Sequence, residues 1–484
     1  MKAMPYPSRT LLTKNTVNAI TVFWAILGFG LSVFYPTSDW QALLGVLMVS
    51  QAFSGRLTWI RFRRTEEAIL PDFLTMYLFS QFGFKTLTAI GIYLSQGINE
   101  IGMAMGGIRE SDEAIPFEYQ FQAEVVFLAA MLIFTFVWYK LERNRMLAVW
   151  YEPPSKIIWN FYAITMISYI VLGYFEQSLG LLRSIFNISA IGTIALLLGG
   201  KTAYSLGRGK SWLSILALMP LLMIALRSGM KAEVILVLMP ILLPVFRKRM
   251  TPLRFSILAG VIVILVLFVL PFSQVWRDAN WYRQENASIS DVASTVAGKW
   301  DENGLLQTAM DSTAAWLLRG SSSAQGGLVM QLADRDGLIG PVLIEGLVSI
   351  FVPRFLWPDK PKYMPGAWFT WYLGKAESPE TATTSTAMML PTELYWMFGE
   401  FGVIVGMVVI AFLYFYTYKY IFKISKTGVF PVLSLFYMLI QVTTFESSHT
   451  IYVLSSPAIL IVYTLGLDKL QKTFFPKLSI YSGR

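Results

Sequence analysis

Long apolar runs, separated by short polar stretches, dominate the pattern of this chain. A membrane-spanning helix needs about 20 mostly apolar residues, and twelve segments approach that length. They lie at about 17–35, 40–55, 69–94, 121–139, 157–175, 180–199, 212–227, 231–246, 254–272, 397–418, 429–446 and 450–467. The segments that begin at 40, 212, 231 and 450 are short, and the pair around Arg227 could form one broken element. The pattern predicts an all-α, polytopic membrane helix bundle with about 12 transmembrane helices.

One long polar insertion interrupts the series. It divides the chain into residues 1–272 with nine predicted spans, a segment at 273–396, and residues 397–484 with three spans. Apolar spacing inside the insertion predicts short helices. These are a helix at 301–319, a second one capped at 321–323 and ending near Asp334, a helix at 338–352 lying in the membrane surface, and a polar loop at 377–385.

Composition agrees with a membrane protein. Hydrophobic residues make up 55% of the 484 residues and charged residues 14%, whereas soluble domains carry about 25% charged residues. The chain has no cysteine and one histidine, His449, which excludes disulfides, thiolate sites and a histidine metal cluster. We therefore expect no metal and no cofactor.

Positive charge lies on one side of the predicted spans. If the N-terminus is cytoplasmic, the loops on that side, Arg61 included, hold 25 of the 39 lysines and arginines, and the short external connections hold none. Positive short loops stay inside, so we expect both termini to be cytoplasmic and 273–396 to be extracytoplasmic (periplasmic). These charges are interpreted as determinants of orientation that also attract anionic lipid. They explain most of the net charge of +9, so nucleic acid is not an expected partner.

Several charged residues fall inside the predicted spans, where they are costly and usually face a cavity or a partner. Lys85 with Glu124, and Glu176 with Arg183, are interpreted as structural ion pairs.

The outer turn at 227–233 (RSGMKAE) has the composition of an anion site. Arg227 can bind a phosphate through two parallel hydrogen bonds, and Lys231 adds a mobile positive charge. Ser228 could cap the following helix, whose N-terminus favours an anion. The alternative is an ordinary charged hairpin.

Further external cations complete the predicted anion-binding set. Arg354 and Lys360 flank an aromatic turn that prolines make stiff, and Arg277 directly follows the ninth span. With Arg227 and Lys231, they are the residues that we expect to hold a diphosphate.

Candidates for a general base are also external. They are His449, Glu393, Glu446, Glu400 and Asp359, of which we select the first three as catalytic candidates. A histidine with its ordinary pKa near 6.5 suits proton transfer at neutral pH. The alternative for a lone histidine is a hydrogen-bonded structural role.

Two stretches resemble bacterial O-antigen polymerases of the Wzy type. They are PRFLWPDKP at 353–361 and ELYWMFGEFG at 393–402, and the arginine-containing turn at 227–233 is similar to one in the same family. The similarity covers about thirty residues and the topology of the chain.

The resemblance implies a GT-C-like membrane glycosyltransferase of the bacterial cytoplasmic membrane. Such an enzyme polymerises polyprenyl (undecaprenyl) diphosphate-linked oligosaccharide repeat units at the outer membrane face, within lipopolysaccharide or capsule synthesis. Cations would stabilise the leaving diphosphate, a base would take the acceptor proton, and Trp357 and Tyr395 would stack on sugars. A chain-length regulator protein is the further partner that it implies.

Two other functions stay open. An O-antigen ligase-like transferase shares the topology and uses lipid A core as the acceptor. A flippase or transporter would move the lipid-linked glycan without bond chemistry. The sequence leaves the sugars, the linkage and the stereochemistry undefined.

Overall fold

The computed structural model describes residues 14–34, 40–63, 72–97, 115–142, 155–173, 189–191, 193, 216–228, 234, 237, 260, 263–282, 287–319, 322–347, 352, 357, 364–382, 386, 388–425, 432–443 and 448–474. Every regular element in these ranges is helical, so the predicted all-α class is confirmed for them. Five of the described helices are long and apolar enough to cross a membrane. By length and composition the chain is an α-helical membrane protein, and the total of twelve spans stays a prediction.

Helices occupy ten of the twelve predicted spans over at least part of their length. They are α1 (Lys14–Phe34), α2 (Trp40–Arg63), α3 (Phe73–Gly97), α4 (Phe117–Leu141), α5 (Ser155–Gly173), α9 (Leu218–Ser228), η2 (Leu265–Val269), α18 (Leu390–Ser425), α19 (Val432–Thr443) and α20 (Thr450–Phe474). The segments at 180–199 and 231–246 lie mostly outside the described residues.

Two of the spans that the hydropathy pattern predicts to be short are full-length helices. α2 has 24 residues and α20 has 25. Polar and charged residues toward their C-terminal ends, such as Arg61 and Asp468, lower the local hydropathy without ending the helix. The predicted lengths were therefore wrong for both.

The segment between the ninth and tenth predicted spans is folded into short helices. They are α12 (Leu270–Arg277), η3 (Asp278–Tyr282), α13 (Ile289–Asn303), α14 (Leu305–Arg319), α15 (Ser322–Asp336), η4 (Gly340–Leu343) and α17 (Pro365–Tyr372). The helix that contains α12 runs on through the predicted boundary at 272 and 273. The second short helix is confirmed as α15.

Two helix predictions in this segment were wrong in detail. The predicted helix at 301–319 is broken at Gly304, whose φ of +83° only glycine adopts easily. The start of the predicted helix at 338–352 is a 3₁₀ turn, because Gly337, Gly340 and Pro341 interrupt an α-helical path. Residues 377–381 of the predicted polar loop at 377–385 form turns and bends.

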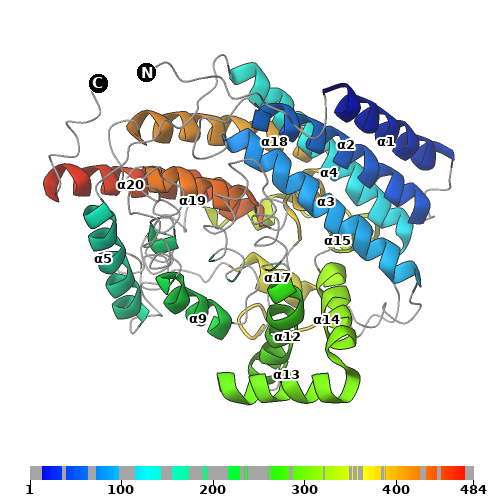
Figure 1. The fold of residues 1–484 in the computed structure, drawn as a ribbon. Helices are drawn as coiled ribbons and strands as arrows, with labels where there is room; N and C mark the ends of the chain where they lie inside the picture. Colours follow the sequence, from blue (N-terminus) through cyan, green and yellow to red (C-terminus); the bar gives the residue numbers. More distant parts are fainter. Residues whose placement is uncertain are drawn as a thin grey trace.

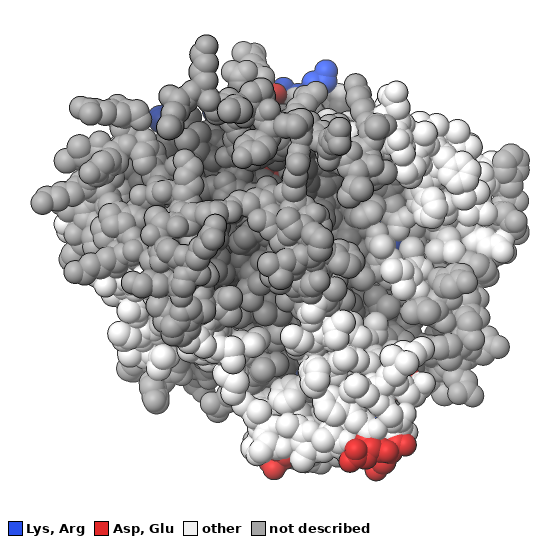
Figure 2. Space-filling view, viewed as in Figure 1, with Lys and Arg blue, Asp and Glu red and all other residues white. Residues whose placement is uncertain are grey.

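The first four helices pack side by side, and α12, α13 and α14 lie together beyond them (Figure 1). α1 approaches α2 closely because Gly28 faces Gly45, where added methyl groups would meet backbone atoms. A large apolar core joins α3 and α4 to α18, α19 and α20. On the face drawn in Figure 2, acidic side chains gather where Figure 1 shows α13, which carries exposed Asp301 and Glu302.

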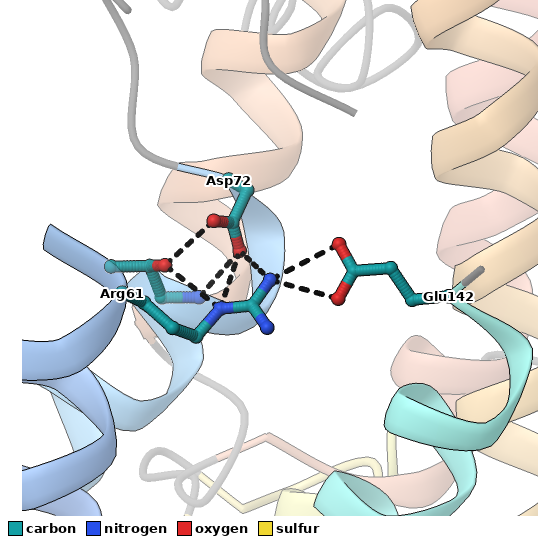
Figure 3. A network of polar contacts seen from close by, with 4 residues as sticks. Arg61, Asp72 and Glu142 are labelled. Carbon is teal, nitrogen blue, oxygen red and sulfur yellow. Dashed lines mark hydrogen bonds and ion pairs between the residues drawn. The ribbon is translucent and has the colours of Figure 1, made fainter. Parts of the chain in front are cut away.

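A buried charge cluster fastens one end of the bundle (Figure 3). Arg61, in the last turn of α2, donates to Asp72 before α3 at 2.7 Å and to Glu142 after α4 at 3.0 and 3.1 Å. Asp72 also accepts from the backbone N–H and the hydroxyl of Thr75, so the Asp72 carboxylate caps the start of α3. The interpretation of Arg61 as an orienting loop charge was incomplete, because its side chain is 1% exposed and ties three helix ends together.

Three helix ends that the charge pattern assigns to one side of the membrane lie at one end of the bundle. Phe73, beside Asp72, stacks on Trp138 of α4 at 4.7 Å and lies 6.0 Å from Tyr418 of α18. The C-terminal ends of α2, α4 and α18 therefore meet there. Which side of the membrane this end faces stays a prediction.

Candidate functional site

The N-terminal part of α18 folds back on the rest of the helix. Phe398 has φ −141° and Gly399 has φ +67°, so the helix is broken there. A methyl group on Gly406 would lie 2.8 Å from the Leu394 side chain. Those residues are twelve positions apart, which a straight helix would separate by about 18 Å. Residues 390–397 therefore form a short leg that reverses direction at the break and lies against the longer leg.

Small residues allow this close approach. Gly402 and Gly406 are one turn apart on the long leg, and both face Leu394. The end of the short leg is held by the preceding segment. Ile339 donates its N–H to the Trp396 carbonyl at 3.0 Å, and the Trp396 indole donates to the Gly337 carbonyl at 3.2 Å. Met389, at the other end, has a left-handed φ of +64°, which is strained for a non-glycine residue.

The short leg brings Glu393 to the start of α20. Its carboxylate is fully buried, and Oε2 lies 3.0 Å from Nδ1 of His449, whose side chain is 8% exposed. Oε1 accepts the backbone N–H of Thr450 at 3.2 Å. The carboxylate thus sits at a helix N-terminus, where the free N–H groups and the helix dipole favour negative charge.

Two of the three residues predicted as catalytic are therefore in direct contact, Glu393 in α18 and His449 directly before α20. Because Nδ1 of His449 faces Glu393, Nε2 is the nitrogen that remains for a proton or a ligand. Tyr452, one turn along α20, has its ring centre 6.0 Å from the imidazole and is 45% exposed. The imidazole therefore lies just below the surface, beside an exposed aromatic ring.

A second buried carboxylate lies in the same bundle. Glu124 of α4 pairs with Lys85 of α3 at 2.9 Å, and both side chains are at most 1% exposed. Ser323 of α15 donates to the other oxygen of Glu124 at 2.8 Å. Lys85 also lies 4.2 Å over the ring of Phe127. The predicted Lys85–Glu124 pair is confirmed.

This second carboxylate docks α15 of the polar insertion onto α4. Methyl groups on Gly326 and Gly327 would lie about 3 Å from side chains of α4, so the two helices touch along their backbones. At the C-terminal end of α15, Tyr372 and Arg335 donate to Asp336, and the bonds from Arg335 lower the pKa of that carboxyl group. Burial raises the pKa of Tyr372.

Several predicted site residues lie outside the described residues. They are Glu446 among the catalytic candidates and Lys231, Arg354 and Lys360 among the diphosphate-binding candidates. Arg227 is placed in the last turn of α9 by its backbone, and its side chain is outside the description. The convergence of these cations on one pocket stays a prediction.

The other predicted site residues have described positions. Arg277 is half-buried in the last turn of α12, and Trp357 is 41% exposed. Tyr395 is half-buried, on the same short leg as Glu393. It packs against the apolar cluster that contains Phe127, Met330 and Met389, so packing accounts for part of its surface, and its sugar contact stays a prediction.

Thr450 and Tyr452 belong to the site and were not singled out from the sequence. The signal was their position within one turn of the only histidine in the chain. Comparisons with protein-family models, with curated proteins and with solved structures found no match for this chain.

Proposed function

We propose that the protein is a membrane glycosyltransferase that polymerises lipid-diphosphate-linked oligosaccharide repeat units. The observation that carries the proposal is the buried contact between Glu393, on the short leg of α18, and His449, at the start of α20. It supplies an imidazole that is oriented by a carboxylate, which is the arrangement of a general base. Glu393 belongs to the stretch that resembles the polymerase family.

In the proposed reaction Glu393 holds His449 with Nδ1 toward the carboxylate. Nε2 then takes the proton of an acceptor sugar hydroxyl as that oxygen attacks the anomeric carbon of the donor. The bond from the anomeric carbon to the lipid diphosphate breaks, and the diphosphate leaves with the electron pair. The predicted cations Arg227, Lys231, Arg354, Lys360 and Arg277 would stabilise its charge.

The direct test is a polymerisation assay with the full-length protein. Purified protein in liposomes is incubated with a lipid-diphosphate-linked repeat unit extracted from cells that lack the gene. A ladder of longer glycans is expected. If glycan length stays constant while the substrate crosses the bilayer, the protein is a flippase and the proposal is wrong.

The lipid-linked glycans of the deletion strain separate a polymerase from a ligase. Loss of a polymerase leaves single repeat units on the lipid carrier, whereas loss of a ligase leaves long lipid-linked polymer. Arg227→Ala and Arg354→Ala test the cations in cells. Both variants are expected to abolish polymer at normal protein level, and full-length polymer from both would remove their assigned roles.

A further inference from the structure

Thr450 carries a polar group that the fold itself leaves unused. Its backbone N–H binds Glu393, and the residue is 1% exposed. Its hydroxyl oxygen has no hydrogen-bond partner within the part of the chain that the structure describes. Burying a hydroxyl without a partner is unfavourable, because its hydrogen bonds to water are lost and not replaced. Such a group in a folded protein calls for an explanation.

Other buried threonines in the same chain solve this problem locally. Thr58, Thr392 and Thr464 donate to the carbonyl four residues earlier at 2.6–2.7 Å. Thr450 is the first residue of α20, so α20 itself offers it no carbonyl four residues earlier. Its hydroxyl therefore stays unpaired within the described chain, one residue after His449.

The chemistry of the free hydroxyl indicates its ligand. A threonine hydroxyl can donate one hydrogen bond and accept others, as a sugar hydroxyl does. A diphosphate offers acceptors alone and is better bound by cations. We propose that Thr450 is a substrate-positioning residue whose hydroxyl binds a hydroxyl of the acceptor sugar, next to the one that His449 deprotonates. This inference rests on the proposed transferase function.

The test compares two valine variants that each remove a buried, unpartnered hydroxyl. Thr450→Val alters the site. Thr135→Val is the control, because Thr135 of α4 is 3% exposed and its hydroxyl also has no partner within the described chain. Phe134, the residue before Thr135, packs on Phe73, which places Thr135 on the part of α4 near the Arg61 cluster. Thr450→Ser retains the hydroxyl and should restore function.

Elongation of the extracted lipid-linked repeat unit is measured together with the thermal midpoint of each full-length variant. Thr450→Val should lower kcat/KM about 10- to 100-fold, with an unchanged or higher Tm. Thr450→Ser should stay within about threefold of the wild type, since the hydrogen bond is retained. Thr135→Val should keep the wild-type rate with an unchanged or higher Tm.

The inference is overturned if Thr450→Val elongates glycans like the wild type. It is also overturned if its rate falls only as far as its folded fraction, or if Thr135→Val loses as much activity. A wild-type protein that makes no ladder would instead contradict the proposed function, so the two failures are distinguishable.

Discussion

Two buried carboxylates in this bundle have nearly the same surroundings and different partners. Glu124 and Glu393 are both fully buried, and each binds a nitrogen of a second helix at 2.9–3.0 Å. Each uses its other oxygen for a donor at a helix start, Ser323 for Glu124 and the N–H of Thr450 for Glu393. The partner nitrogen belongs to a lysine in one pair and to a histidine in the other.

The comparison shows what distinguishes a structural ion pair from a site that can transfer a proton. An ammonium group beside a carboxylate stays charged and holds helices together, whereas an imidazole can accept and release a proton near neutral pH. The lysine pair is covered by α15, while the histidine lies beside the exposed ring of Tyr452. We therefore expect substitutions at Lys85 to change stability and substitutions at His449 to change turnover.

The largest effect is expected when the histidine pair is made to resemble the lysine pair. His449→Lys can still pair with Glu393, but it offers no base near neutral pH, so elongation should fall about 100- to 10,000-fold. His449→Asn should lose a similar amount. The rate of elongation, measured beside the thermal midpoint, checks this. A lysine variant with wild-type turnover would show that the imidazole is structural.

The lysine pair should respond in the opposite way. Lys85→Met leaves Glu124 buried without its cation, which typically costs about 3–5 kcal/mol of unfolding free energy. The double variant Lys85→Met with Glu124→Leu should recover much of that loss. Denaturant unfolding in detergent measures both. Elongation per folded molecule should stay at the wild-type level, and a specific loss of turnover would end the distinction between the pairs.

A smaller effect is expected from the reversal that carries Glu393. Gly406→Ala places a methyl group 2.8 Å from Leu394, and such overpacking costs about 1–3 kcal/mol. The displaced leg should also weaken the Glu393–His449 contact and slow elongation. Gly466→Ala in α20 is the control, because its methyl group would meet nothing within 4 Å. Equal rates in the two variants would mean that the position of the leg is not critical.

The smallest effect on stability is expected from a substitution at the start of α13, which should leave both buried pairs unchanged. Ser288 and Asp291 form a capping box at the start of α13, with the Asp291 N–H 3.2 Å from the Ser288 hydroxyl. Ser288→Ala should cost about 1 kcal/mol, seen as faster amide exchange in α13. Exchange near Glu124 or Glu393 should not change. A global change in exchange would show that α13 is coupled to the bundle.

The sequence pattern was sufficient to locate most of the described long helices and one contact between neighbouring spans, the Lys85–Glu124 pair. Lys85 and Glu124 could be paired because each is a charge of opposite sign inside an apolar run, where a lone charge is costly. His449 and Glu393 were separate candidates. Their contact joins residues 56 positions apart and depends on the reversal at Phe398 and Gly399. The sequence pattern instead placed Glu393 in the polar segment at 273–396, outside the span that it began at 397.

Two other predictions, for Arg61 and for the helix at 301–319, were incomplete or wrong for different reasons. An arginine at the end of an apolar run can contact lipid headgroups or form a buried ion pair, and the sequence alone does not distinguish the two. The burial of Arg61 with Asp72 and Glu142 was therefore not predicted. Gly304 interrupts an apolar spacing that continues on both sides of it, so α13 and α14 were not separated. The burial of Arg61 is decided by partners distant in the sequence, whereas the break between α13 and α14 is decided by the backbone of Gly304 itself.

The position of the Glu393 partners also affects how the protein is made. His449 and Thr450 leave the ribosome more than fifty residues after Glu393. A chain that ends before His449 would contain the Glu393 carboxylate without the two partners that bind it, the His449 imidazole and the backbone N–H of Thr450. The start of α20 is therefore the element whose synthesis completes the partners of the Glu393 carboxylate.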